Sequence, residues 1–581
     1  MDEERKIFCI PSISTLVIVI TPLLLLPLPV YIPGKESLIV YISLLVSVYW
    51  ASACLPLSVT GIIPVFLFPA AGILTNKEAT SAFFFPGLWL FTGSIIFAIA
   101  VQSSNLHFRI ALKMLLLIGT RPKRLLLGFM VTAFILSMFF ANLAVVAMLM
   151  PIAEEVLNEM EKPTASEERL NLELNESKLL KINLTDKEDA SLKSSVTSSL
   201  VEDGNNQSEH AQNHANRMKR FRVALTLSVS YSSAVGGIGT IPGSAANVAV
   251  VAMLKDLYPD SPEISYGQWF LYCTPCAAVT LILMYAWILW YHLGFRSKEE
   301  MDENFSARKM MMKKYDELGP ITWDQLWILI LFLTTVVLWF TKSPGFCTGW
   351  GDGVMDGYVA DGTVVMATSF LLFLIPNQKP VVFDRPDKAK RRSVPLLTWK
   401  VFEAKFPWGI LFVVGGCLTI AKAFESSNLP DILEEALSFL AWIPPWLTCL
   451  VAALFTTYVT ECMSGIAALT LIFPVMKGVA KTTHIHPFYF SMPPAQTCSL
   501  AFMLPVATVP TTLAYSYGHF TIKDMIKTGW LLNLVGVFVI MLGTHTYGGF
   551  IFNFDQYPLW AETLNASIAG EIYNLTLNNT L

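Results

Sequence analysis

The sequence predicts an all-α polytopic membrane protein with eleven transmembrane helices and two re-entrant hairpins, arranged as an inverted-topology repeat. Composition is the first observation: 54% of the 581 residues are hydrophobic and only 14% are charged, whereas a soluble domain carries about a quarter charged residues. The second observation is a series of long apolar runs, and the third is an internal repeat. The net charge of −4 gives no reason to expect a nucleic-acid partner.

Eleven apolar runs are long enough to cross a bilayer, which takes roughly 20 helical residues. They lie near 13–31, 38–55, 58–75, 84–102, 220–254, 266–293, 323–341, 361–376, 407–424, 488–517 and 525–547. Two further apolar segments, 124–156 and 443–476, carry polar residues at their midpoints. We expect these two segments to be re-entrant hairpins that enter and leave the bilayer on one side.

Lys and Arg residues predict the orientation, because loops rich in these residues stay in the cytosol. They gather in four segments, at 121–126, 217–222, 296–314 and 384–393. Segment 425–445 and the tail 548–581 contain neither residue. The two sides alternate consistently when the N-terminus is cytosolic, the C-terminus is extracellular and the two hairpins do not cross.

This pattern divides the chain into seven segments. They are a cytosolic N-terminus at 1–12, the first span and first part of one repeat at 13–157, a disordered cytosolic loop at 158–218, the end of that repeat at 219–293, a cytosolic linker at 294–322, the second repeat at 323–547 and an extracellular tail at 548–581. The loop is polar and lacks periodicity, which is typical of disorder. Both the loop and the tail contain Asn-x-Ser/Thr sequons, but glycosylation takes place on the extracellular side. We therefore expect it in the tail, at Asn565, Asn574 and Asn578.

An internal repeat relates the two halves of the protein. Residues 88–106 and 411–429 both end in Ser-Ser-Asn-Leu and lie 323 positions apart. The same spacing relates Pro151 in the first hairpin to Pro474 in the second. The charge pattern opens the first hairpin to the cytosol and the second to the outside, which is the inverted topology of many secondary transporters.

Each half also contains a span interrupted by helix-breaking residues. The stretch VGGIGTIPGSAANVAV at 235–250 places four glycines and a proline inside an apolar run, and these residues cost about 1 and 3 kcal/mol each in a helix interior. Its counterpart in the second half is 505–512. Broken helices occur at membrane depth where they line a cavity or pack against protein, and their carbonyls and helix N-termini can bind a cation and an anion. A kink that serves only packing is the alternative.

Six stretches form recognisable motifs: LPLSVTGIIPVFLFPAAGIL (55–74), NLHFRIALKMLLLIG (105–119), AMLMPIAEEVL (147–157), FPWGILFVVGG (406–416), HPFYFSMPP (486–494) and SLAFMLPVAT (499–508). They resemble the divalent anion:sodium symporters, the solute carrier family of sodium-coupled dicarboxylate, citrate and sulfate cotransporters. The likeness runs from the first span to 544–553. It implies eleven spans, two hairpins, an elevator-type transport domain and a homodimer in the plasma membrane.

The resemblance also implies a Ser-Asn-Thr at each hairpin tip, where sodium and a substrate carboxylate bind, but this chain reads Ala141-Asn142-Leu143 and Ser464-Gly465-Ile466. Sodium needs about five or six oxygen ligands. The ligands that we expect are Ser137, Asn142 and the Gly239 carbonyl in the first half, and Thr460, Ser464 and the Ala507 carbonyl in the second. The substrate-binding residues that we expect are Asn142, Thr240, Ser244, Ser464, Gly465, Thr508 and Thr511.

The predicted function is secondary active transport of di- or tricarboxylates such as succinate and citrate, with sodium as the coupling ion. Leu143 and Ile466 remove hydroxyls, and each hydrogen bond lost to a charged group costs about 1.5–3 kcal/mol. A sodium-independent exchanger, a sulfate transporter and a non-transporting sensor therefore stay open as alternatives. We see no nucleophile–base arrangement or phosphate loop and expect no enzyme.

The positions of two charged residues lead to further expectations. Glu461 is an acidic residue at membrane depth, which makes it a functional candidate. Arg109 lies on an apparent amphipathic helix over 104–119, and we expect this helix to lie at the membrane interface with Arg109 solvated.

Overall fold

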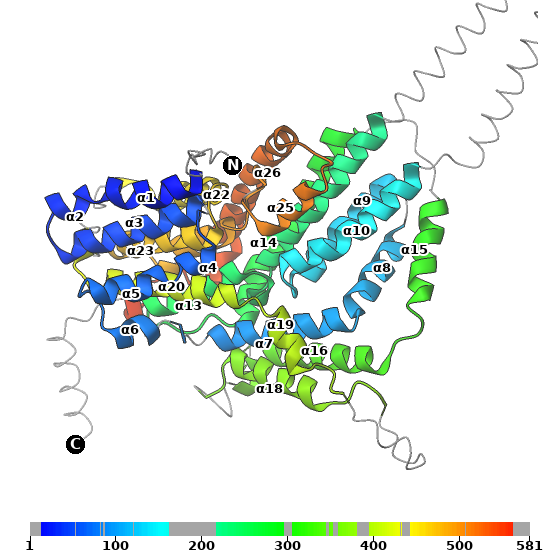
Figure 1. Ribbon diagram of the computed structural model, residues 1–581, viewed down its shortest axis with the longest axis horizontal. Coiled ribbons are helices and arrows are strands. Elements are labelled where there is room, and N and C mark those ends of the chain that lie inside the picture. Colours follow the sequence, from blue (N-terminus) through cyan, green and yellow to red (C-terminus); the bar gives the residue numbers. More distant parts are fainter. Residues whose placement is uncertain are drawn as a thin grey trace, which may run out of the picture.

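The computed structural model describes residues 13–561 with gaps, and every regular element in that part is a helix (Figure 1). The gaps fall at 53, 82, 85–86, 120, 162–215, 295–304, 344–347, 352–357, 380–393, 430–431, 433–441 and 506. The predicted N-terminus 1–12, nearly all of the 158–218 loop and the predicted glycosylation sites Asn565, Asn574 and Asn578 lie outside the described residues. The predicted all-α class is confirmed for the described part.

Five described helices are long and apolar enough to cross a bilayer. They are Ser14–Tyr31, Tyr266–Leu293, Trp323–Lys342, Gly465–Thr483 and Ile522–Phe552. Two helix pairs reach that length only with a bend, of 73° between Gly87–Ser103 and Leu106–Ile118 and of 57° between Trp399–Lys405 and Trp408–Phe424. Length and composition therefore identify five to seven spans among the described residues, because several of the eleven predicted apolar runs are broken or hold shorter helices.

The chain begins with a layer of helices that flanks the rest of the molecule (Figure 1). These helices are α1 (Ile13–Leu25), α2 (Pro27–Tyr31), α3 (Lys35–Ser52), α4 (Leu57–Thr60), α5 (Ile63–Ala70) and α6 (Asn76–Ser81). α1 packs on α3, while Leu23 and Leu24 on its other face are exposed. Exposed leucines suit a surface that faces lipid.

The first half of the repeat forms a bent pair, a hairpin and a broken helix. Its elements are α7 (Gly87–Ser103), α8 (Leu106–Ile118), α9 (Pro122–Ser137), α10 (Asn142–Glu161), a helix over 216–238, the 3₁₀ turn η1 (Ile241–Gly243), α13 (Ala245–Leu257), α14 (Tyr266–Ile288) and the π-helix η2 (Leu289–Leu293). α9 and α10 pack side by side around a turn at 138–141. The predicted break lies at 239–244, where the glycines and Pro242 stand.

The second half follows after the linker helix α15 (Phe305–Glu317). Its elements are α16 (Trp323–Lys342), α18 (Asp361–Leu374), α19 (Trp399–Lys405), α20 (Trp408–Glu425), α22 (Pro445–Thr460), α23 (Gly465–Thr483), α24 (Pro487–Thr497), α25 (Val509–Ser516), α26 (Ile522–Gly543), the π-helix η4 (Thr544–Gly548), α27 (Gly549–Phe552) and the 3₁₀ turn η5 (Leu559–Ala561). α22 and α23 form a second hairpin around 461–464, and the chain between α24 and α25 is irregular. Each half therefore supplies one hairpin and one broken helix.

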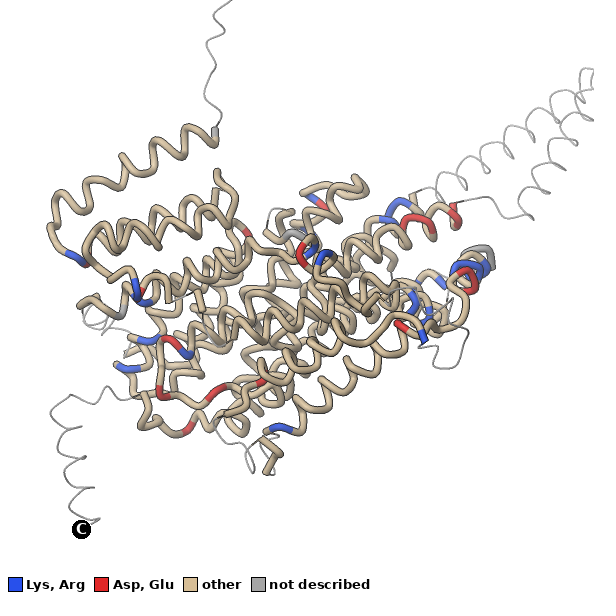
Figure 2. The backbone as a smooth tube through the Cα atoms, turned by 60° about the horizontal axis from the view of Figure 1, so that its bottom comes forward, with Lys and Arg blue, Asp and Glu red and all other residues tan. Residues whose placement is uncertain are grey.

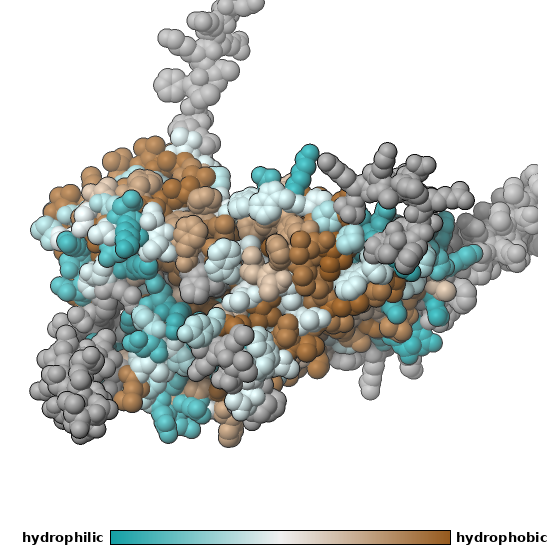
Figure 3. Space-filling view, turned by 90° about the horizontal axis from the view of Figure 1, so that it is seen from below, coloured by the Kyte–Doolittle hydropathy of each residue, from teal (hydrophilic) through white to brown (hydrophobic). Residues whose placement is uncertain are grey.

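Charged residues gather in patches around the periphery of the view, and the helices between these patches are largely uncharged (Figure 2). α9, α10 and α15 lie together at one end (Figure 1), which carries the basic residues near 121–124 and 308–314. The surface between the ends is rich in hydrophobic side chains (Figure 3). This distribution fits a protein whose middle lies in a bilayer.

Arg109 on α8 is buried, so the expectation that it is solvated is wrong. Its side chain is 5% exposed, and its guanidinium donates to Gln325 Oε1 at 3.1 Å and to the carbonyls of Gly319 and Leu318 at 2.8 Å. The amphipathic pattern placed Arg109 on the polar face of the helix but could not reveal that a loop covers this face. Arg109 thereby fixes α8 to the loop before α16.

We expect Arg109→Ala to lower the free energy of unfolding by about 3–5 kcal/mol, because buried carbonyls lose charge-assisted hydrogen bonds. Thermal unfolding of the purified protein in detergent measures the change. Lys77→Ala on α6 is the control, because Lys77 is exposed and such substitutions stay within about 0.5 kcal/mol. Equal stability of the two variants would contradict the structural role of Arg109.

Candidate functional site

The first hairpin tip and the first helix break form one polar cluster. Ser137 Oγ lies 2.8 Å from the Asn142 amide and 2.7 Å from Ser233 Oγ. Ser233 Oγ in turn donates to the Asn142 carbonyl at 3.1 Å. With its nitrogen turned toward the break, the Asn142 amide also donates to the carbonyls of Gly243 at 3.2 Å and Ser233 at 3.3 Å. Hydroxyl, amide and carbonyl groups thus converge from α9, α10, the 216–238 helix and η1.

This cluster depends on glycine at two positions where chains approach closely. A Cβ atom on Gly237 would lie 2.5 Å from the side-chain amide of Asn142. A Cβ atom on Gly243 would lie 2.7 Å from the Gly237 carbonyl and 2.9 Å from the Ser137 carbonyl. Only glycine lets these backbones approach the tip, which explains why the helix-breaking residues stand opposite the hairpin.

Side chains bind the carbonyl groups that the first break leaves outside a helix. Asn247 Nδ2 donates to the carbonyls of Gly237 and Thr240, both at 2.7 Å. Trp269 Nε1 donates to the Ile238 carbonyl at 3.1 Å. The Gly239 carbonyl, a predicted sodium ligand, accepts from Thr274 Oγ1 at 2.9 Å, and a carbonyl oxygen has a second lone pair for another partner.

The second tip lies against the start of the second break. Ser464 caps α23 by accepting from the Ala467 N–H at 3.4 Å. A Cβ atom on Gly465 would lie 2.8 Å from the Cys498 carbonyl, so this tip also meets irregular backbone. The predicted ligand Thr460 donates its hydroxyl hydrogen bond to the Thr457 carbonyl at 2.8 Å.

Glu461, between α22 and the tip, organises the second break. Its carboxylate is buried and accepts from the backbone N–H groups of Phe502 at 2.8 Å, Met503 at 2.9 Å and Leu504 at 3.0 Å. Asn533 Nδ2 on α26 donates to the same carboxylate at 2.7 Å. A carboxylate that accepts hydrogen bonds from four donor groups fixes the irregular chain to the hairpin.

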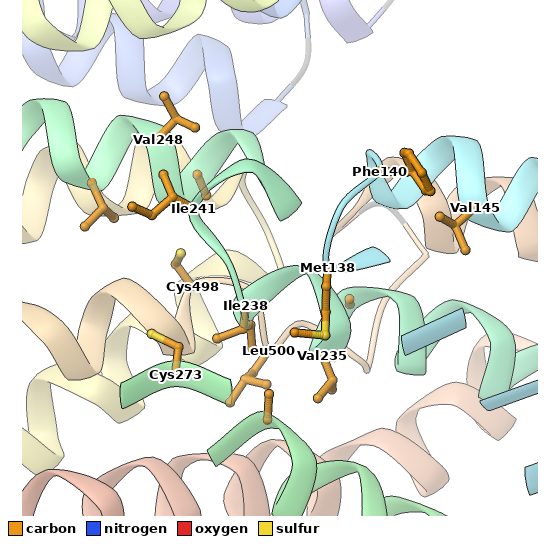
Figure 4. Packing of buried hydrophobic residues seen from close by; sticks show 14 of the residues in the cluster. Met138, Phe140, Val145, Val235, Ile238, Ile241, Val248, Cys273, Cys498 and Leu500 are labelled. Carbon is orange, nitrogen blue, oxygen red and sulfur yellow. The ribbon is translucent and has the colours of Figure 1, made fainter. Parts of the chain in front are cut away.

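The two broken helices touch each other through the 216–238 helix. Ser230 Oγ donates to Thr511 Oγ1 at 3.3 Å, and Tyr231 donates to the Phe502 carbonyl at 2.6 Å. The hydroxyls of Thr508 and Thr511 lie 2.5 Å apart at the start of α25. Apolar side chains pack around this junction. Figure 4 shows those of Met138, Val235, Ile238, Cys273, Cys498 and Leu500.

The structure brings only some of the predicted site residues into direct contact. Ser137 and Asn142 share the first cluster, and Thr508 and Thr511 share the start of α25. Thr240 donates to the Met138 carbonyl, and Ser244 caps α13. Ser464, Gly465 and Ala507 lie at the second tip and break. The sequence did not predict Ser233, Asn247, Asn533 or Trp269 as site residues. The available signal was Asn247, the one amide side chain inside the quoted glycine-rich stretch.

Four helix N-termini, those of α10, α13, α23 and α25, lie at the tips and breaks. Each carries roughly half a positive charge. Oxygen atoms of the kind that bind hard cations lie beside them. The arrangement can therefore hold a small cation next to a carboxylate or another small anion, within protein that keeps the irregular backbone hydrogen-bonded.

Comparisons with known proteins agree on one family. The model of the sodium:sulfate symporter transmembrane region matches residues 10–554. The Na(+)/citrate cotransporter of Rattus norvegicus is 34% identical over 568 residues, which cover 94% of this chain and 97% of the relative. The Na(+)/dicarboxylate cotransporter 3 of Mus musculus is 33% identical, with 97% of both chains covered, and solute carrier family 13 member 4 of Homo sapiens is 32% identical, with 95% and 97% covered.

We expect Gly237→Ala to raise the sodium concentration needed for half-maximal stabilisation about tenfold, because the new methyl group displaces Asn142 at a cost of about 1–3 kcal/mol. The unfolding temperature, measured against sodium with choline as the replacement, reports this change. Gly549→Ala is the matched control, since nothing lies within 4 Å of its Cβ position. An unchanged sodium response in Gly237→Ala would show that Asn142 does not belong to the cation site.

Glu461→Gln should lower the free energy of unfolding by about 2–4 kcal/mol. The N–H₂ group of the new glutamine would face backbone N–H groups, and donors that the carboxylate had accepted from would lose their partner. Glu161→Gln serves as the control: the carboxylate of Glu161 is 47% exposed and pairs with Arg222 at 2.8 Å, and such pairs contribute about 0–1 kcal/mol. Similar losses in the two variants, measured by denaturation in detergent, would show that Glu461 does not hold the break.

Proposed function

The chain belongs to the sodium:sulfate symporter family, and we propose that it is a sodium-coupled secondary transporter of di- and tricarboxylates such as citrate and succinate. The observation that carries the proposal is the pairing of oxygen clusters with helix N-termini at both tips. The names of two relatives, a sodium/citrate and a sodium/dicarboxylate cotransporter, support it. Its action as a transporter agrees with the family, whose matched relatives are transporters and not enzymes.

In this proposal, Ser137, Asn142 and the carbonyls of the first break supply one sodium site. Thr460, Ser464 and the Ala507 carbonyl supply a second. Leu143 and Ile466 cannot donate hydrogen bonds from their side chains, so the backbone N–H groups at the helix N-termini carry more of the anion binding. Those donors do not depend on the identity of the side chain.

The substrate anion lies between the two tips and the starts of α13 and α25. Asn142, Thr240, Ser244, Ser464, Gly465, Thr508 and Thr511 surround it in this proposal. Sodium ions next to the carboxylates offset the repulsion among negative groups, which couples the binding of cation and anion. Coupling of this kind is reciprocal: sodium raises the affinity for the anion, and the anion raises the affinity for sodium.

The finer architecture belongs to the same proposal. Eleven spans and two re-entrant hairpins form an inverted repeat, in which an elevator-like domain carries the site across the plasma membrane within a homodimer. The N-terminus is cytosolic, and the C-terminal tail is extracellular and glycosylated. The helix–turn–helix geometry of α9–α10 and α22–α23 and the charge pattern of the loops support this arrangement.

Cells that express the protein should take up labelled citrate or succinate at least about tenfold faster in sodium than in choline, because the anion alone lacks its counter-charges. Initial rates of uptake measure this, with surface expression checked by labelling. Asn142→Ala should remove the sodium-dependent part, whereas Gly549→Ala should keep it. Equal uptake in sodium and choline would contradict the sodium coupling, and no uptake of either anion would contradict the substrate class.

A further inference from the structure

A cavity of about 230 Å³ lies between α13 on one side and α7, α18 and α20 on the other. Its lining includes the buried Ile241, which lies in the first break, and Ser81 and Glu263, which are exposed. None of the described residues at the two hairpin tips lines it. The cavity therefore leads from the surface toward the first break without being part of the tip site.

Two half-buried lysines from different halves of the chain line this cavity. Lys255 lies in the last turn of α13 and donates to the Ser261 carbonyl at 2.7 Å. Lys422 lies in the last turn of α20 and donates to Ser81 Oγ at 3.0 Å. An ammonium group has three N–H donors, so each lysine can bind a ligand as well as its protein partner.

Two helices also direct their N-termini at the cavity. α7 begins at Gly87 and α18 at Asp361, and both residues line it. The partial positive charge of a helix N-terminus favours an anion. Apolar side chains such as Leu90 and Leu418 form part of the wall, and an apolar wall strengthens electrostatic attraction.

Three carboxylates also line the cavity, those of Asp256, Glu263 and Asp361. Asp361 is held by Lys342 at 2.9 Å and by the Tyr266 N–H at 3.2 Å, so its charge is compensated within the protein. Glu263 is exposed at the rim. Of the three, Asp256 is the half-buried carboxylate that opposes the two ammonium groups.

Glu78 also interacts electrostatically with Lys422, although it does not line the cavity. Its carboxylate is bound to Thr75, whose N–H and hydroxyl both donate to Oε2 at 2.8 Å. Those hydrogen bonds, followed by Lys422, lower the pKa of Glu78. Glu78 is exposed, and solvent screens the attraction between exposed charges. The attraction between Glu78 and Lys422 is therefore weak, and Lys422 can still attract an anionic ligand.

We propose that the cavity between α13 and α20 is a second anion site, in which Lys255 and Lys422 hold a small carboxylate on its way to the tips. The inference rests on the proposed function, which supplies the class of anion. Ile241, in the first break, lines the same cavity, so the proposed site borders the first break. Holding anions at the mouth raises their local concentration and their rate of association.

Initial uptake rates against citrate concentration test the site in Lys255→Gln, Lys422→Gln and the double variant. We expect KM to rise about tenfold in the double variant, with maximal rate within about twofold, because each lysine donates a charge-assisted hydrogen bond. Lys422→Arg should keep the parent KM, and Lys77→Gln, an exposed lysine outside the cavity, is the matched control. An unchanged KM in the folded double variant would overturn the proposal.

A binding measurement separates this site from the proposed function. In sodium-free choline buffer, where the tips lack their cation, citrate should still raise the unfolding temperature of the purified parent, and the double variant should lose that rise. A parent that shows this shift but no uptake would refute the proposed function and support the cavity. Sodium-dependent uptake without any sodium-free shift would refute the cavity and leave the function standing.

Discussion

The structure depends on one constraint: backbone groups released where a helix breaks inside an apolar protein must find new hydrogen-bond partners. An unpaired buried carbonyl or N–H costs about 1–3 kcal/mol, and each break releases several. Asn247 and Trp269 bind carbonyls at the first break, while the Glu461 carboxylate gathers three successive N–H groups at the second. The breaks are therefore fixed structures, which is what a site built partly from backbone atoms requires.

To find these partners, the irregular backbone of the first break has to come close to the hairpin that faces it. Gly237 and Gly243 allow this approach because they have no Cβ atom. The close contact places Asn142 among hydroxyls and carbonyls that belong to three other elements. In the proposed site, the side chains of Leu143 and Ile466 offer no hydrogen bond, and the main chain provides the donors and acceptors instead.

The positions of the hairpins and breaks could be predicted from the sequence, since Gly and Pro have intrinsic helix costs and the repeat relates the two halves. The partners of polar side chains could not. Ser233, Asn533 and Trp269 look like ordinary residues of apolar spans, and only tertiary packing brings them to Asn142, Glu461 and Ile238. Arg109 shows the same limit, because helix periodicity gives the face on which a residue lies but not what covers that face.

The contact between Ser230 and Thr511 joins the 216–238 helix of the first half to α25 of the second, with Tyr231 bound to the Phe502 carbonyl beside it. One consequence concerns recombination. A hybrid chain that takes its first half from this protein and its second from a relative inherits one partner of the hydroxyl pair from each parent. The pair then persists only if the donor of the second half also carries a hydroxyl at the position of Thr511, so this junction limits which halves can be exchanged.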